Sequence, residues 1–275
     1  MKNKRSFYLT LNRLRVLSQI TTILFLIAVP LLNIVGVHWI LGTLYSISFG
    51  KLDIADPAIV AQTILLTWNL YIPLLIAALI PILIAFICGR VFCSWICPHN
   101  TISEWITAFQ KRFMTKRWRQ YQKKSKNVGI RVYFGILATL LLVTALFKTP
   151  LVSYLSPPGV ISSQISQLIR GSGIGLELAI VLLIFIAEFF LFQRYWCKLL
   201  CPVGAMLGAF HWKGKLRVQF QAAECKCGKR PSPCQMACPL QLEPKKKNLY
   251  PACFNCGLCA KACENTGHKA IQLTF

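Results

Sequence analysis

Two short stretches of the chain share one pattern. Residues 89–98 read GRVFCSWICP and residues 193–202 read QRYWCKLLCP. In both, an arginine is followed two residues later by an aromatic residue, then by two cysteines separated by three residues, and then by proline. Each stretch comes at the end of a long apolar run. The agreement in register predicts an internal duplication, in which each half of the chain contributes one copy of the motif.

Each copy offers a pair of cysteines, which are Cys93 and Cys97 in the first and Cys197 and Cys201 in the second. Side chains four residues apart lie on one face of a helix, and the proline after the second cysteine disfavours continuation of the preceding turn. If a twofold axis brings the copies together, the four thiolates form an additional site suited to a metal ion or an iron–sulfur cluster. The alternative is two thiol-bearing helix ends with a redox or packing role.

The apolar runs are long enough for membrane spans. Of the 275 residues, 55% are hydrophobic, and a helix of about 20 apolar residues crosses a hydrocarbon core of about 30 Å. Four runs meet this length, at about residues 16–40, 59–87, 132–151 and 174–192. The sequence therefore predicts a mainly α fold, a four-helix transmembrane bundle of two hairpins related by an axis along the membrane normal. A soluble enzyme with a core of ordinary size is excluded.

The charge distribution predicts the orientation of these spans. The chain has 31 Lys and Arg against 8 Asp and Glu. The N-terminal arm has 5 of them, residues 90–131 have 10 and residues 194–275 have 13, so 28 lie on one side and 3 on the other. Because loops rich in Lys and Arg stay in the cytoplasm, both termini and the middle loop are predicted to be cytoplasmic. The charge is spread between apolar segments, so nucleic-acid binding is not expected.

A second group of cysteines lies near the C-terminus. Cys253, Cys256, Cys259 and Cys263 have the spacing with which a short loop wraps three thiolates around one [4Fe–4S] cluster and sends the fourth to a second cluster. Upstream lie four more cysteines with an irregular spacing. The crossed pattern then predicts cluster one at Cys238, Cys253, Cys256 and Cys259, and cluster two at Cys225, Cys227, Cys234 and Cys263. The alternative is zinc, which needs only four thiolates in two knuckles.

These cysteines divide the chain into two predicted domains. Residues 1–212 form the four-span membrane domain, and residues 213–275 form a small α+β ferredoxin-like domain of the bacterial two-cluster type. Alternation of apolar and polar residues at 216–220 and 271–275 predicts two short paired strands beside the clusters. About 60 residues bury too little apolar surface to fold alone, so the clusters are expected to contribute folding energy.

Taken in this order, the duplicated cysteine motif, the four apolar runs and the cysteine-rich tail resemble the NapH/MauN group of membrane ferredoxins over nearly the whole chain. The resemblance implies a multi-pass protein of the bacterial inner membrane and a quinol dehydrogenase component with two [4Fe–4S] clusters. Such a component draws electrons from menaquinol or ubiquinol. It passes them, with a NapG-like ferredoxin or a membrane-anchored cytochrome, toward a periplasmic reductase such as nitrate reductase.

Quinol oxidation also needs a proton acceptor, and the candidate is Glu188 in the fourth apolar run. An ionisable group at that depth indicates either proton handling or a glutamate neutralised by protonation or by a basic neighbour. His99 follows the first cysteine pair and is a candidate ligand or hydrogen-bond donor to a sulfur, and His211 is the corresponding candidate for the second pair. His38 could bond a quinone carbonyl, or it is an ordinary interfacial side chain.

Two other functions are compatible with the sequence. The first is an assembly or metal-handling factor, in which the duplicated cysteine pairs bind or reduce a metal for insertion elsewhere and the tail supplies electrons. The second is a structural membrane anchor for a redox partner. Cluster reduction by a menaquinol analogue distinguishes the quinol-oxidising protein from both.

Overall fold

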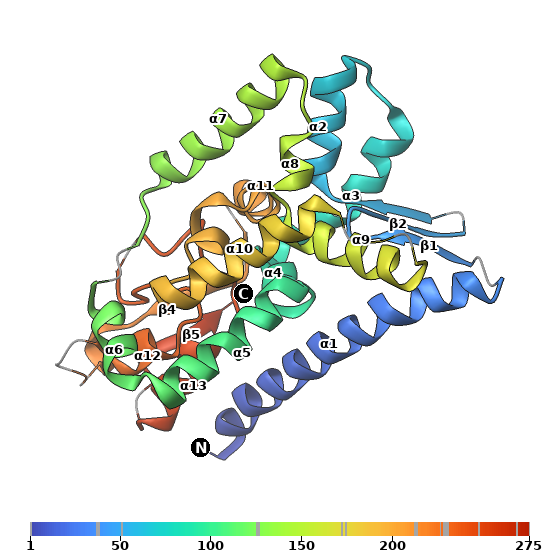
Figure 1. The fold of residues 1–275 in the computed structure, drawn as a ribbon. Helices are drawn as coiled ribbons and strands as arrows, with labels where there is room; N and C mark the ends of the chain where they lie inside the picture. The colour runs from blue at the N-terminus through green and yellow to red at the C-terminus, as the bar shows by residue number, and fades with distance from the viewer. Residues whose placement is uncertain are drawn as a thin grey trace.

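The computed structural model describes residues 2–36, 39–50, 52–124, 127–171, 173, 175–211, 214–225, 227, 231–246, 248–267 and 269–274. As expected, the fold is mainly helical (Figure 1). The elements of the first half are α1 (Lys2–Ile34), β1 (Ile40–Thr43), β2 (Ser46–Phe49), β3 (Leu52–Ala55), α2 (Pro57–Thr67), α3 (Ile72–Cys88), α4 (Val91–Trp95), α5 (Pro98–Phe113) and α6 (Thr115–Lys124).

The second half repeats part of this order and then adds the tail. Its elements are α7 (Ile130–Phe147), α8 (Leu151–Tyr154), α9 (Pro157–Ile169), α10 (Leu176–Leu191), a π-helix (Trp196–Leu200), α11 (Pro202–Phe210), β4 (Arg217–Phe220), a 3-10 turn (Ala222–Glu224), α12 (Pro233–Ala237), α13 (Leu258–Asn265) and β5 (Ile271–Thr274). In each half a long helix is followed by a short one, by an apolar helix, and by the cysteine motif that opens a further helix.

The two halves pack across one another. Helix α5 follows the first cysteine motif and packs against α9 and α10 of the second half. Helix α11 follows the second motif and packs against α2 and α3 of the first half. The helix after each motif thus contacts the short helix and the apolar helix of the opposite half, as a pseudo-twofold arrangement requires. This exchange brings the two cysteine motifs into contact between the halves.

Two helices in the described part of the chain have both the length and the composition of a membrane span. They are the segment Phe7–Ile34 of α1, with 28 residues, and α7, with 18. Helices α3 and α10 are apolar but have 17 and 16 residues. At 1.5 Å per residue they are about 25 Å long, short of a core of about 30 Å. The four-helix transmembrane bundle therefore remains a prediction, because two of its four helices, α3 and α10, are shorter than a membrane span.

The expectation of one continuous helix over residues 59–87 is wrong. Helix α2 ends at Thr67, and Trp68 adopts a left-handed conformation with φ 54°. Helix α3 then begins at Ile72 with Pro73 in its first turn. Proline restricts the residue before it to extended conformations and is well tolerated only in the first turn of a helix, so Pro73 favours a new start at this point. The run is two helices joined by a short connection.

A small sheet, which the sequence analysis did not predict, occupies residues 40–55. Strands β1, β2 and β3 pair antiparallel in that order, with Ile40 opposite Phe49 and Ser46 opposite Ala55. The side chain of Asp56 then accepts a hydrogen bond from the N–H of Ala58 at 2.9 Å, which caps the first turn of α2. The sheet lies at one end of α1, while α13 of the tail lies near the other (Figure 1).

The tail packs directly onto the helices. The predicted strand pair is confirmed, because β4 and β5 are antiparallel with Val218 opposite Leu273. One apolar core contains residues of both parts of the chain, namely Ala85, Val203 and Leu207 from the helical part with Leu240, Leu242, Leu249, Ala252 and Phe254 from the tail. The tail is therefore packed as a continuation of the helical core. The domain boundary at residues 212 and 213 remains a prediction.

Candidate iron–sulfur sites

One small cavity in the tail is lined by Cys238, Cys253, Cys256 and Cys259, the four cysteines predicted to hold cluster one. Its other walls are mostly apolar, with Val218, Leu240, Leu242, Leu249 and Phe254 among them. Backbone N–H groups point at two of the sulfurs. That of Leu242 donates to Cys238 Sγ at 3.3 Å and that of Asn255 to Cys253 Sγ at 3.5 Å.

This cavity fits a [4Fe–4S] cluster by its donor set. Four thiols converge from two separated segments, the walls are dry, and N–H···S bonds of this kind are among the interactions that tune such clusters. Burial, together with the neighbouring Cys256, raises the pKa of Cys238 to about 11. The free thiols are therefore protonated at neutral pH, and binding of iron as thiolates releases their protons.

The four cysteines predicted for cluster two lie in the adjoining part of the tail. Cys234 and Cys263 are buried in one apolar cluster with Ala270 and Ile271, and Cys225 packs against it. Burial raises the pKa of Cys263, and Cys234 and Cys227 raise it further, so these three thiols are neighbours.

Cys225 is the fourth cysteine of this set, and its side chain is only partly buried. Burial would raise the pKa of its thiol, but hydrogen bonds from the Cys227 backbone and from Lys245 outweigh this effect and lower it. Lys245 Nζ also donates to the carbonyl of Cys227 at 2.9 Å. The lysine thus favours a thiolate at the edge of the site, which is the form that binds iron.

Helix α13 connects the two tail sites. It carries Cys259, which lines the cavity, and Cys263, which belongs to the second set. The two cysteines are four residues apart, so they lie on the same face of one helical turn. The crossed ligand pattern expected from the sequence is therefore compatible with the structure.

The duplicated motif places its four cysteines at the interface between the halves. Cys97 precedes α5 with φ −64° and ψ 116°, and Cys201 precedes α11 with φ −64° and ψ 114°, so the two positions are conformationally equivalent. Burial raises the pKa of Cys97, and Cys93 and Cys201 raise it further. Cys201 and Cys97 act on Cys197 in the same way. The four thiols, called the interface cysteines below, form one group.

One trio of side chains beside the interface cysteines lies close enough to share a metal ion. A tetrahedral zinc site with Zn–S bonds of 2.3 Å holds its sulfurs about 3.8 Å apart. In the described residues, the one trio of His, Cys, Asp or Glu side chains close enough to share one ion is His99, Glu188 and Cys197, whose ligand atoms lie within 4.8 Å of one another. Cys197 of this trio also belongs to the interface cysteines.

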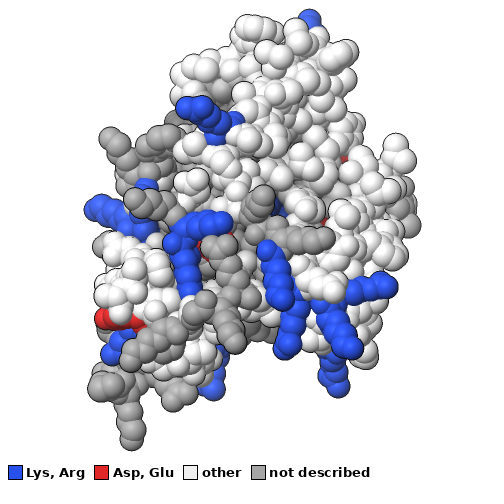
Figure 2. Space-filling view, turned by 90° about the vertical axis from the view of Figure 1, so that its left-hand side faces the viewer, with Lys and Arg blue, Asp and Glu red and all other residues white. Residues whose placement is uncertain are grey.

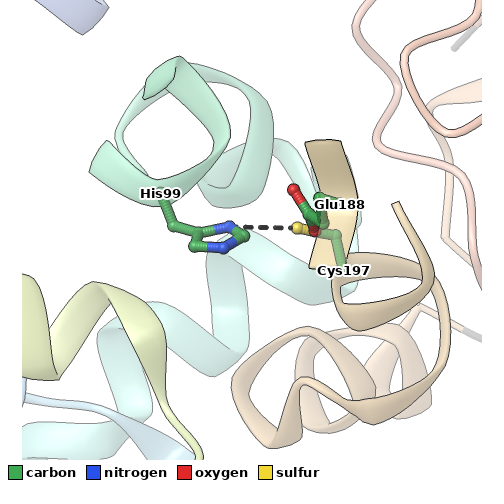
Figure 3. A group of neighbouring side chains, drawn as sticks. All are labelled: His99, Glu188 and Cys197. Carbon is green, nitrogen blue, oxygen red and sulfur yellow. Dashed lines mark hydrogen bonds between the residues drawn. The ribbon is translucent and has the colours of Figure 1, made fainter. Parts of the chain in front are cut away.

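That trio joins three segments (Figure 3). His99 Nδ1 lies 3.3 Å from Cys197 Sγ, and the His99 ring stacks on Phe185 with centroids 4.7 Å apart. Glu188 Oε2 accepts a hydrogen bond from Ser103 Oγ at 2.7 Å. Neither Glu188 Oε1 nor His99 Nε2 has a partner in the described part of the chain. Burial, together with Arg194, lowers the pKa of His99 to about 3, so its ring is neutral at physiological pH.

The arginine that opens each motif is buried between the halves. Arg90 donates to the carbonyl of Ala252 in the tail at 3.1 Å and to that of Cys197 at 2.9 Å. Arg194 donates to Asn100 Oδ1 and Thr107 Oγ1, both at 2.9 Å. A cluster bound by four thiolates carries net negative charge, and buried guanidinium groups offset it. The sequence marked these arginines only as part of the repeat.

The other histidines have different surroundings. His211 Nε2 lies 3.5 Å from Asn255 Nδ2, and its ring packs against Tyr250, so it contacts the tail rather than the second cysteine pair. Asn255 Nδ2 in turn donates to the carbonyls of Cys88 and Leu216, both at 2.9 Å. His38 lies outside the described residues.

Sequence reasoning missed the contacts that fix the N-terminal helix beside these sites. Arg15 in α1 forms a partly buried ion pair with Glu104 in α5. Gln19 Nε2 donates to the carbonyl of Ser94 at 3.0 Å, and Ser18 Oγ to that of Trp95 at 3.2 Å. Polar residues at three places in an apolar run were the available signal, but their partners lie 75 or more residues away.

Thirteen cysteines in this pattern are typical of an iron–sulfur electron-transfer protein. Comparison with known proteins agrees. A family described as a 4Fe-4S binding domain matches residues 70–116 and 174–220, which are the two copies of the repeat with their cysteine pairs. The chain belongs to the NapH/MauN family of ferredoxin-type proteins.

Two relatives illustrate the match. The methylamine utilization ferredoxin-type protein MauN of Paracoccus denitrificans is 30% identical over 229 residues, 82% of this chain and 67% of that protein. The ferredoxin-type protein NapH of Haemophilus influenzae is 27% identical over 267 residues, 90% of this chain and 85% of that protein. No solved structure matches the chain.

Proposed function

We propose that this protein oxidises quinol in the bilayer and passes the electrons through three iron–sulfur clusters, one at the interface cysteines and two in the tail. The iron–sulfur chemistry follows from the family and the cysteine groups. The quinol, the interface cluster and the direction of transfer are the proposed parts.

One observation carries the proposal. Cys93 and Cys197 of the interface group share a single apolar core with Cys238, Cys253 and Cys256 of the tail cavity. Electron transfer slows steeply with distance, so clusters in series must lie close together. The second tail site lies next to the first, because α13 carries Cys259 of one site and Cys263 of the other. The interface site is thus the link between the apolar helices and the tail.

The surface supports a multi-pass arrangement with both termini in the cytoplasm. Helices α3 and α10 expose large apolar side chains that water would not stabilise, including Ile76, Leu79, Leu83, Leu183, Ile186 and Phe190. On the face shown in Figure 2, most Lys and Arg side chains gather in the lower half, and Asp and Glu are few. An apolar belt above a basic end is typical of an inner-membrane protein whose basic end faces the cytoplasm.

Quinol oxidation releases two electrons and two protons. The interface cluster, when bound, would accept the electrons one at a time and pass them to the tail clusters. Glu188 would take up one proton, since Ser103 fixes one of its oxygens and leaves the other without a partner in the described residues, and the second proton would go to water. Downstream partners of the kind implied by the family are a NapG-like ferredoxin or a membrane-anchored cytochrome, leading to a periplasmic reductase such as nitrate reductase.

The test is an anaerobic count of iron and acid-labile sulfide in the full-length protein in detergent, combined with electron paramagnetic resonance. The wild type should hold about twelve irons, and a variant with all four interface cysteines changed to serine should hold about eight. Cys88→Ser is the matched control, because Cys88 belongs to none of the three groups, and it should keep about twelve. A menaquinol analogue should reduce the clusters of the wild type and not those of the quadruple variant.

An assembly or metal-handling role is the second candidate, favoured by the trio of His99, Glu188 and Cys197, which could share one ion. It predicts a metal other than iron at the interface cysteines and no reduction by the quinol analogue. That pair of results would reject quinol oxidation in favour of metal handling.

A further inference from the structure

The two copies of the motif differ at the residue after the proline. The first copy has His99 there, and the second has Val203. Both side chains are buried, at 1% and 3% exposure. The pseudo-twofold arrangement therefore presents two pairs of cysteines but one imidazole, and that imidazole lies against the sulfur of Cys197 in the opposite copy.

The geometry of this contact is fixed. His99 Nδ1 is 3.3 Å from Cys197 Sγ, within hydrogen-bonding distance for sulfur. The ring is held nearly parallel to Phe185, with an interplanar angle of 16°. Arg90 anchors the other side of the contact by donating to the Cys197 carbonyl at 2.9 Å. Neither partner can turn away without losing buried packing.

The direction of the hydrogen bond follows from the protonation of the sulfur. A thiolate bound to iron carries no proton, so it can only accept, and Nδ1 must then donate. A ring whose single proton is on Nδ1 has a lone pair on Nε2. Nε2 has no partner in the described part of the chain. A buried acceptor without a partner is tolerated better than a buried donor, which favours the same tautomer.

We propose that His99 donates a hydrogen bond from Nδ1 to the Cys197 sulfur and thereby raises the reduction potential of the cluster at the interface cysteines. The inference rests on the interface cluster of the proposed function. A hydrogen bond to a ligand sulfur withdraws negative charge, which stabilises the reduced, more negative cluster more than the oxidised one. His99 is a positioning residue for that sulfur and has no ligand role.

The test is a redox titration of the full-length protein monitored by electron paramagnetic resonance. The interface signal is identified as the one lost in the quadruple cysteine variant. His99→Phe keeps a ring that can stack on Phe185 but removes the donor. It should lower the potential of the interface cluster by a shift equivalent to about tenfold in the equilibrium constant for reduction, which is 59 mV for one electron.

Two controls accompany this variant. His99→Asn places an amide N–H near the position of Nδ1 and should restore most of the potential. His211→Phe removes a buried histidine that contacts the tail, and it should leave the interface potential unchanged. An unchanged potential in His99→Phe, with the cluster present, would overturn the inference.

A separate measurement covers the case in which His99→Phe does not retain its cluster. In wild-type protein with ¹⁵N-labelled histidine, the reduced interface cluster should show a weak nitrogen hyperfine coupling across the hydrogen bond, and the coupling should disappear in His99→Asn. Absence of the coupling in the wild type overturns the inference. An iron count of about eight in the wild type instead rejects the interface cluster itself, and so the proposed function.

Discussion

Glycine at position 204 makes room for Arg90. A Cβ added to Gly204 would lie 2.0 Å from Arg90 Nη2, which is too close for two atoms that are not bonded to each other. Tyr133 closes the same space from α7, where its hydroxyl donates to the Gly204 carbonyl at 2.9 Å. Arg90 can therefore reach the Cys197 carbonyl because residue 204, in the second half of the chain, has no side chain.

We expect Gly204→Ala to destabilise the protein by about 1–3 kcal/mol, because the guanidinium must leave its two carbonyl partners or the helix must shift. Thermal unfolding in detergent, followed by loss of the cluster absorbance, measures the effect. Gly135→Ala in α7 is the control, since its Cβ meets nothing within 4 Å. Equal stability of the two variants would show that Arg90 is held by other contacts.

Glu188 is the second residue whose replacement is informative. Glu188→Gln can still accept from Ser103 but cannot take up a proton, so we expect reduction of the clusters by a quinol analogue to slow by at least about 100-fold. Reduction by dithionite should be unchanged. Glu177→Gln on the same helix is the matched control, because Glu177 lies in the first turn of α10. Unaltered quinol kinetics in Glu188→Gln would exclude this residue as the proton acceptor.

Among the elements, α1 is attached to the sites by polar contacts inside an apolar run. Arg15 is 4% exposed and pairs with Glu104, which also accepts from Asn100 Nδ2 at 3.1 Å. Asn100 is the partner of Arg194, so α1 is connected through α5 to the second motif. The apolar surface of α1 alone does not fix its position, and these bonds fix its rotation and its height relative to α5.

Arg15→Ala should cost about 1.5–3 kcal/mol, because it leaves the partly buried Glu104 carboxylate without its counter-charge. The double variant Arg15→Met with Glu104→Met should recover most of this loss. Urea denaturation of the purified protein compares the two. A double variant less stable than Arg15→Ala would show that the pair contributes by more than neutralising charge.

Elements differ in how far the sequence predicts them. The pair β4 and β5 was predictable, because alternation over five residues is a local signal. The break between α2 and α3 had a signal in the sequence, Asn69 and Pro73 within the apolar run, but the length of the run favoured one helix. The interface cysteines were predictable as a set from the repeat, whereas the roles of Arg90 and Asn255 depend on carbonyl groups more than 100 residues away.

At the scale of the whole molecule, the amide of Asn255 is one of several groups that hold the tail on the helices. Asn255 donates to the carbonyls of Cys88 and Leu216 and accepts from the Tyr250 hydroxyl at 2.6 Å. The contact joins the end of α3, the start of the tail and the loop that carries Cys253 and Cys256. The amide of Asn255 therefore stabilises both the loop that carries ligands of cluster one and the end of α3.

We expect Asn255→Asp to destabilise the docked tail by about 3 kcal/mol, because a carboxylate would face two carbonyl oxygens in place of the donating amide. Limited proteolysis should then cut within residues 238–263, and the iron content should fall. Asn265→Asp, on the exposed end of α13, is the control and should leave the proteolysis pattern unchanged. A resistant, iron-replete Asn255→Asp protein would contradict the supporting role of this amide.

The shared core also limits how this protein can be divided. Leu240, Leu242 and Phe254 of the tail pack in one apolar core with Ala85 and Leu207 of the helical part. Either part alone would therefore expose apolar side chains that the other part covers. A gene fragment encoding residues 213–275 should yield aggregated material even when iron is supplied. Chimaeras that exchange tails between relatives should fold only when the matching faces of α3 and α11 are exchanged with them.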